Sequence, residues 1–466
     1  MHPRDELEQL GYTQELRRSL SFTDLVVYGL IFMVPIAPFG IFGGVFQASG
    51  GMVALAYAIG MAAMIFTASS YAQMVRAFPV SGSVFTYAGR ALNAAIGFLA
   101  GWIILLDYLL VPALLYLVAS VAMHAVVPAV PVWLWLVGFV LFNTVINYLG
   151  IRMTAKVTRV MLVGEIVVLI IFLTIGVLAL LAGKGRGFSL DPIFNHATFH
   201  WSVVFGAVSV AVLSFLGFDG ISMLAEENEG GSRQIGRAMA AALVLAGVLF
   251  IVQTWVAALL VPDPQTLLTD GDPNGTAFYD AARAAGGAWL ATLTAAATAI
   301  AWGIANALVA QVATSRLLFA MARDRQLPSP LARVSIRHGV PANAISLVAV
   351  LSLGLGLYMA HRSDGIALLS SLINFGAMTA FLVLHVSVVW HYFIRGRGRR
   401  RNVFTHLVFP VIGFGILLYV VINAKVAAQR LGLAWLGLGL VILVGFYVAG
   451  RKPSLGRHLA YAEGRR

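Results

Sequence analysis

The stretch MVPIAPFGIFGG, Met33 to Gly44, interrupts what is otherwise a hydrophobic helix. Two prolines and three glycines within twelve residues remove backbone donors and lower helix propensity. In lipid, each unpaired backbone group costs several kcal/mol, so non-helical backbone persists only where it is buried in protein or lines a cavity. The stretch therefore predicts a broken membrane span beside a site for a polar molecule.

The composition of the whole chain supports a membrane protein. Of its 466 residues, 60% are hydrophobic and only 11% are charged, and the mean hydropathy is +0.89. Soluble domains carry about 25% charged residues, so this chain has too little polar surface to coat a globule in water. It contains no cysteine, which excludes disulfides and thiolate metal sites. The predicted fold class is all-α and polytopic.

About twelve transmembrane helices are expected from the hydropathy pattern. Their approximate bounds are 22–47, 51–74, 94–123, 131–150, 157–182, 201–225, 236–261, 288–318, 342–360, 365–392, 404–424 and 431–449. With the N-terminus inside, 25 of the 31 Lys and Arg residues fall on the cytoplasmic side. The net charge of +12 is thus a topology signal, not a nucleic-acid footprint. Segments 1–20 and 450–466 are expected to be cytoplasmic, on a multi-pass protein of the cell membrane.

A second interrupted span reads SFLGFDGISMLAEENEGG, from Ser214 to Gly231. It lies about 180 residues after the first break, and each break falls in the first span of a five-span block. Matching interruptions predict two inverted repeats, 21–182 and 200–392, followed by two extra helices within 404–449. The alternative is a pair of proline kinks whose freed backbone groups are satisfied by neighbouring helices.

Several further stretches resemble the amino acid–polyamine–organocation superfamily of secondary transporters. They are FPVSGSVFTYAGRALN (78–93), GWIILLDYLLVP (101–112), SRLLFAMARDRQLP (315–328) and INFGAMTAF (373–381). The LLDYL and LINFGA stretches look most like bacterial putrescine importers. The resemblance implies a five-plus-five inverted repeat, a substrate site beside unwound spans 1 and 6, and alternating access driven by a proton gradient or by exchange.

The first break departs from the superfamily pattern. Members that carry amino acids usually show a Gly-small-Gly-Ile-Phe run whose N–H groups hold the substrate carboxylate. Here the run is Pro38-Phe39-Gly40-Ile41-Phe42, and Pro38 has no N–H to donate. This favours a small organic amine or polyamine without a carboxylate. Putrescine importers tend to carry an acid near Gly40, which this chain lacks, so an amino acid substrate stays open.

Ionisable groups inside the membrane are functional candidates by default. Asp107, beside Tyr108 in span 3, is a candidate counter-ion for a substrate ammonium, with the tyrosine ring as a cation–π wall. Asp219 follows the second break and either faces the substrate or caps a half-helix. Glu165 falls where many superfamily members place a lysine, and it is the candidate proton-coupling residue. A hydrogen bond to a neighbouring helix is the alternative role for Asp107 and Glu165, and pairing with a substrate amine is a further alternative for Glu165.

The remaining candidates complete the predicted site. Glu226 and Glu227 are expected to gate the cytoplasmic end, and Phe215 and Phe218 to close over the substrate. The full set of predicted substrate-binding residues is Ile36, Ala37, Pro38, Phe39, Gly40, Asp107, Tyr108, Phe215, Gly217, Phe218, Asp219, Trp302, Asn306 and Asn374.

An enzyme is not expected, because no Walker, Ser–His–Asp or HExxH pattern occurs in the sequence. No cofactor or metal is expected either, and the proton gradient is the expected energy source. The expected partners are a small amine or amino acid and the lipid bilayer. An ion channel is the cross-class alternative, which saturable uptake that collapses with the proton gradient would exclude.

Overall fold

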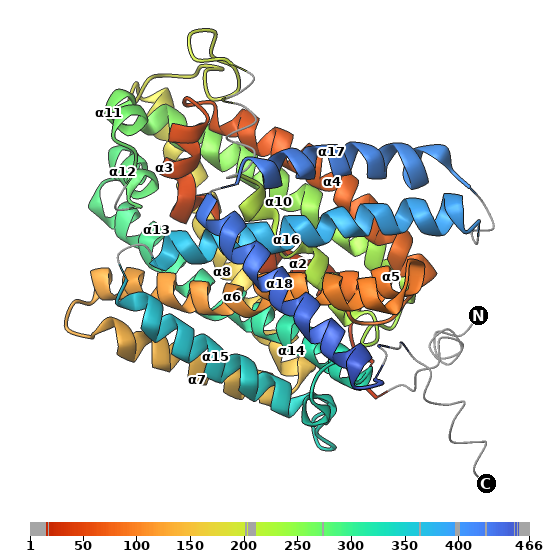
Figure 1. Cartoon of the computed structure of the whole chain (residues 1–466). Coiled ribbons are helices and arrows are strands. Elements are labelled where there is room, and N and C mark those ends of the chain that lie inside the picture. Colours follow the sequence, from red (N-terminus) through yellow and green to blue (C-terminus); the bar gives the residue numbers. More distant parts are fainter. Residues whose placement is uncertain are drawn as a thin grey trace.

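The computed structural model describes residues 15–16, 18–200, 203, 211–272, 275–362, 365–396, 401–424, 426–451, 453 and 455. Within these ranges the regular structure is helical, apart from one isolated parallel bridge between Leu20 and Asn228. In Figure 1 the long helices cross the middle of the molecule, and the short α11 and α12 lie at its upper left.

The elements keep the labels of Figure 1, with η for 3-10 and π segments. In chain order the bounds are α2 Phe22–Met33, α3 Pro38–Ala48, α4 Val53–Ala77, α5 Ser83–Ala91, α6 Ala94–Val126, α7 Val132–Tyr148, α8 Ile151–Leu181, η1 Val212–Phe215, η2 Phe218–Leu224, α10 Ser232–Leu260, α11 Pro264–Thr269, α12 Ala277–Gly286, α13 Ala288–Ile300, η3 Ala301–Asn306, α14 Ala307–Arg323, η4 Ser329–Ala332, α15 Ala342–Ala360, α16 Gly365–Val389, η5 Trp390–Ile394, η6 Phe404–Val408, α17 Phe409–Ile422 and α18 Val426–Val448.

Helices long and apolar enough to cross a membrane number nine in the described chain, and ten if the bent pair α2–α3 counts as one span. The predicted number of about twelve is therefore not confirmed. The fourth predicted span is the shorter helix α7, of 17 residues. The predicted span 201–225 is described fully only from residue 211 onward. Most of the predicted cytoplasmic segments, 1–20 and 450–466, lie outside the described residues.

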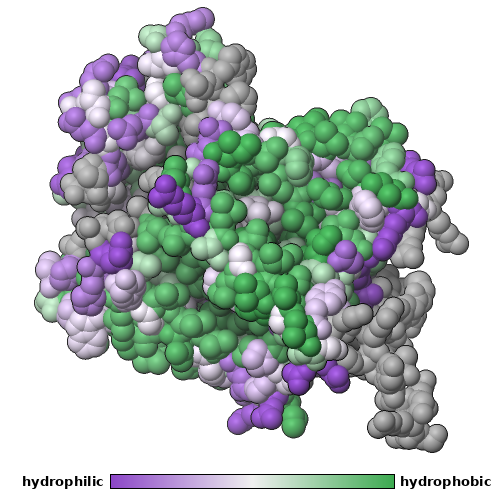
Figure 2. Space-filling model, viewed as in Figure 1, coloured by the Kyte–Doolittle hydropathy of each residue, from purple (hydrophilic) through white to green (hydrophobic). Residues whose placement is uncertain are grey.

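The surface has the character of a membrane protein. Figure 2 shows hydrophobic residues covering the broad middle of this face, with hydrophilic residues gathered around α11 and α12 and near the lower edge. Helices α8, α17 and α18 leave most of their apolar residues on the outside, where lipid would contact them. The chain is a polytopic, all-helical membrane protein.

Helix α6 lies in the interior and organises the core. It packs against α5, α7, α14, α15, α16 and α18. Helix α2 and the short η2 contact each other, and both also contact α10 and α14. The two interrupted segments are therefore held side by side in the centre, within reach of α6.

Candidate functional site

The first break lies where the sequence predicts it. Helix α2 ends at Met33, Val34 has a φ of 55°, and α3 begins at Pro38 with its axis bent by 55° from α2. The carbonyl of Pro35 accepts a hydrogen bond of 2.8 Å from Nε2 of Gln253 on α10. A side-chain amide thus replaces the backbone donor that the break removes.

The second break is centred on Gly217, which joins η1 to η2 with a φ of 111°. A Cβ atom at this position would lie 2.7 Å from the ring of Phe32 and 2.9 Å from the Phe32 carbonyl oxygen. Glycine is needed here both for its conformation and for the close approach of α2. The two breaks therefore contact each other through Phe32.

A cavity of about 870 Å³ lies beside both breaks. Its walls come from the α2–α3 break, α6, the η1–η2 break, α12 and the loop before it, the helix formed by α13 and η3, and α16. Four carboxylates and one guanidinium are among the lining residues: Asp107, Asp219, Asp272, Asp280 and Arg283. Its lining therefore carries more acidic than basic groups, although the chain as a whole is strongly basic.

Two of these carboxylates lie deep in the membrane-spanning region. The Asp219 carboxylate accepts hydrogen bonds from the hydroxyls of Tyr108, at 2.6 Å, and Tyr71, at 3.3 Å. Asp107 is only 5% exposed, and nothing in the described part of the chain donates a hydrogen bond to its carboxyl group. Asp107 therefore offers a charge or an acceptor to whatever occupies the cavity.

A π-helical turn, η3, forms another wall of the cavity. Trp302 and Asn306 on this turn both line the cavity. The Trp302 ring lies against Gly40, where an added Cβ atom would be 3.3 Å from the ring. Within the described chain, Nε1 of Trp302 and Oδ1 of Asn306 have no hydrogen-bond partner. One donor and one acceptor on this turn are therefore buried without a partner beside the cavity.

Eight of the predicted binding residues line this cavity: Ala37, Gly40, Asp107, Tyr108, Gly217, Asp219, Trp302 and Asn306. Six do not: Ile36, Pro38, Phe39, Phe215, Phe218 and Asn374. The cavity therefore brings together the predicted residues at both breaks and the two deep acids, and their role in substrate binding stays a prediction.

The aromatic side chains differ most from their predicted positions. Phe215 packs on Tyr57 and Phe250, and Phe218 packs on Tyr71 and Phe381, so neither covers the cavity in this structure. Their side chains point into the helical core because each packs between rings from distant helices.

Among the described residues, Phe32 is instead the phenylalanine that lines the cavity, with its ring 6.5 Å from that of Tyr108. Sequence reasoning missed it, since an apolar residue within an apolar helix gives no signal. It also missed Asp272, Asp280 and Arg283, whose charges are typical of a solvated loop.

Glu165 lies on the inner face of α8, in line with the buried residues Thr158, Leu169 and Phe172. It does not line the cavity, and both of its carboxyl oxygens are buried without a partner in the described chain.

The chain matches known proteins over most of its length. A family model described as amino acid permease matches residues 22–447. The chain belongs to the amino acid permease family.

Two relatives illustrate the range of substrates within the family. The permease is 32% identical to the low-affinity putrescine importer PlaP of Escherichia coli strain K12, over 94% of this chain and 96% of the relative. It is 24% identical to the branched-chain amino acid permease BcaP of Bacillus subtilis strain 168, over 95% of both chains. The protein is a transporter and not an enzyme.

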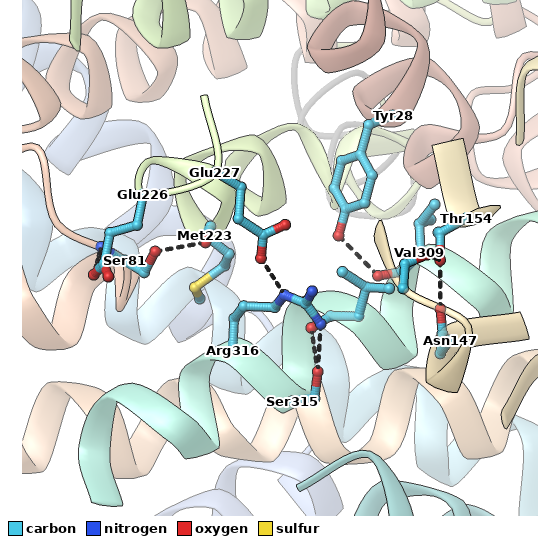
Figure 3. Close-up of polar contacts among 12 residues, drawn as sticks. Tyr28, Ser81, Asn147, Thr154, Met223, Glu226, Glu227, Val309, Ser315 and Arg316 are labelled. Carbon is cyan, nitrogen blue, oxygen red and sulfur yellow. Dashed lines mark hydrogen bonds and ion pairs between the residues drawn. The ribbon is translucent and has the colours of Figure 1, made fainter. Parts of the chain in front are cut away.

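Two ion pairs lie at the end of η2, and Figure 3 draws the one between Glu227 and Arg316. Glu227 accepts a 2.9 Å hydrogen bond from Nε of Arg316, and each side chain is 1% exposed. Glu226 binds both terminal nitrogens of Arg323, at 2.7 and 2.9 Å. We call these four residues the charge cluster. The backbone N–H of Ser81 donates to Glu226, at 3.1 Å, and ties the cluster to the loop before α5.

The charge cluster is also covered by the chain that precedes α2. The backbone N–H groups of Ser19 and Leu20 donate to the Glu227 carbonyl, and the N–H of Glu229 donates to the Leu20 carbonyl. None of the four cluster residues lines the cavity. Glu226 and Glu227 are therefore buried in ion pairs outside the cavity, and their gating role stays a prediction.

Proposed function

We propose that this transporter carries a small organic amine or polyamine without a carboxylate, together with a proton, across the cell membrane by alternating access. In this proposal 21–182 and 200–392 are inverted repeats, 404–449 adds two helices, and both termini are cytoplasmic. The oligomeric state has no bearing on it.

The chief support is the acidic cavity with the unpaired carboxyl group of Asp107. A cationic amine entering there gains a counter-ion without displacing an existing hydrogen bond. Tyr108 uses its hydroxyl to hold Asp219, so it also keeps that second acid in place beside the substrate.

The start of α3 supports a substrate without a carboxylate. At the N-termini of most helices, free backbone N–H groups attract an anion. Here Pro38 has none, and the N–H groups of Phe39 and Gly40 already donate to the carbonyls of Ile36 and Ala37. An amine needs none of these donors. The similarity to a protein named as a putrescine importer agrees with this substrate class.

Glu165 is the proposed proton carrier. Its buried carboxyl group lacks any partner in the described chain, and α8 packs against both α2 and η3. Movement of these neighbours between two states of the carrier would hydrate the acid on alternate sides, allowing it to load and release a proton.

An amino acid substrate is the second candidate, favoured by the free Nε1 of Trp302. The Trp302 ring lies against Gly40 at the first break, and in this alternative its Nε1 donates to the substrate carboxylate. The similarity to a branched-chain amino acid permease points the same way.

Competition in proteoliposomes separates the two candidates. With an imposed proton gradient, we expect putrescine to compete for uptake and alanine and serine not to compete. Arginine is included because it is cationic but also carries a carboxylate. Asp107→Asn should remove putrescine competition, whereas the control Asp191→Asn, in an exposed loop outside the cavity, should retain it. Competition by alanine without putrescine overturns the amine proposal and supports the second candidate.

Proton coupling is tested separately with Glu165→Gln. This variant should lose accumulation against a gradient while it still exchanges substrate. Accumulation with an unchanged dependence on pH would remove Glu165 from the proton path.

A further inference from the structure

The helix of span 8 changes its hydrogen bonding at the cavity. Between Ala301 and Asn306 it is π-helical, and it becomes α-helical again from Ala307. Such turns insert an extra residue into a helix and are frequent at functional sites. Two of the residues through which this helix lines the cavity, Trp302 and Asn306, lie on the π turn. Their direction therefore depends on the turn remaining in place.

The π turn leaves one carbonyl without its usual partner. In an α-helix the N–H of Ala307 would donate to Gly303, four residues earlier. Here the N–H of Ala307 donates to the carbonyls of Trp302 and Ile304 instead. A carbonyl freed in this way is costly inside a membrane protein unless another donor reaches it.

Asn143 of α7 supplies that donor. Its Nδ2 lies 3.0 Å from the Gly303 carbonyl and 3.1 Å from the Tyr116 hydroxyl of α6, and the side chain is fully buried. The close approach depends on Gly303, because a Cβ there would lie 2.6 Å from Ala119 and 3.1 Å from Phe139. The amide thus joins α6, α7 and the π turn at one point.

A second amide one turn along α7 provides a comparison. Asn147 is also buried, and its Nδ2 donates to the Leu308 carbonyl, at 3.2 Å, and to Oε1 of Gln311, at 2.9 Å. Its Oδ1 accepts from Thr154 of α8 (Figure 3). Asn147 therefore binds the α-helical part beyond the π turn and not the carbonyl that the turn frees.

We propose that Asn143 is a positioning residue for substrate binding: by satisfying the Gly303 carbonyl it holds the π turn that directs Trp302 and Asn306 into the cavity. Asn143 itself does not line the cavity. The proposal rests on this cavity being the substrate site, but not on whether the substrate is an amine or an amino acid.

The test uses the full chain in proteoliposomes, with whichever of putrescine and alanine the wild-type protein transports better. Asn143→Leu removes the donor at similar volume, and we expect it to raise KM about tenfold with a smaller change in kcat. Asn147→Leu, a matched change on the same helix, should lower thermal stability to a similar extent and leave KM within about twofold.

A double-variant comparison shows whether Asn143 acts through the turn. If it does, Asn143→Leu should add little to the KM effect of Trp302→Phe, because both changes disturb the same contact. The same direction of KM change is expected from Gly303→Ala, which forces the turn away from α6 and α7. If Asn143→Leu does not fold, the KM of Gly303→Ala tests the positioning role in its place.

Three results would overturn the positioning role. These are equal KM values for the Asn143 and Asn147 variants, an Asn143 effect that is fully additive with Trp302→Phe, or an unchanged KM in Gly303→Ala. The substrate panel addresses the proposed function, so failure of the amine proposal leaves this comparison intact.

Discussion

Replacing Arg316 by methionine tests the charge cluster as a gate. The change leaves Glu227 about 1% exposed with no cationic partner, and its Oε2 already lacks a hydrogen bond from the described residues. Removing one partner of a buried ion pair costs about 3–5 kcal/mol, because the remaining charge is uncompensated. Screening by solvent does not reduce this figure for a pair so deeply buried.

That energy favours any state in which Glu227 contacts water. Opening the layer formed by the charge cluster is such a state, so Arg316→Met should raise the population of the opened form. A cost of about 3–5 kcal/mol corresponds to roughly a hundred- to several-thousand-fold change in the opening equilibrium.

Cysteine labelling measures this equilibrium directly, because the chain has no native cysteine. Met223 is fully buried on η2, and its carbonyl accepts a hydrogen bond from Ser81 beside the charge cluster. In a Met223→Cys background, maleimide labelling should be slow with Arg316 present and much faster in Arg316→Met. The double variant Glu227→Gln/Arg316→Met should regain most of the protection, since a neutral amide is cheaper to bury than a carboxylate.

Two outcomes would refute this reasoning. One is a labelling rate that does not change when Arg316 is replaced. The other is a double variant that labels as fast as the single variant, which would show that packing, and not the unpaired charge, closes this end.

Three further predictions concern thermal unfolding of the purified protein. Gln253→Leu leaves the Pro35 carbonyl without its side-chain donor and should cost about 1–3 kcal/mol, seen as a lower Tm than wild type. Gly413→Ala places a Cβ within 2.4 Å of the His385 ring and should cost about 1–3 kcal/mol through overpacking; an unchanged Tm would show that the helices separate freely there. Arg186→Ala removes a side-chain hydrogen bond to the last turn of α10 and should cost about 1 kcal/mol or less, because the Arg186 side chain is exposed. A wild-type Tm in that variant would contradict its capping role.

The sequence determined the local features of this protein. Prolines without N–H groups interrupt the first span, and a glycine with positive φ interrupts the second. These effects do not depend on how the rest of the chain packs, so both interruptions were predictable from their own residues. Hydropathy located most of the long helices, and the deep acids Asp107 and Asp219 were visible because a charge within an apolar span is rare.

Only the tertiary structure decided which of these residues meet. Asn143 and the Gly303 carbonyl are 160 positions apart, and Glu227 and Arg316 are 89 positions apart. The rings of Phe215 and Phe218 turn into the core while Phe32 faces the cavity, although all three belong to similar apolar surroundings in the sequence. The physical reason is that side-chain direction and long-range hydrogen bonding are set by how whole helices pack, which no local pattern of residues records.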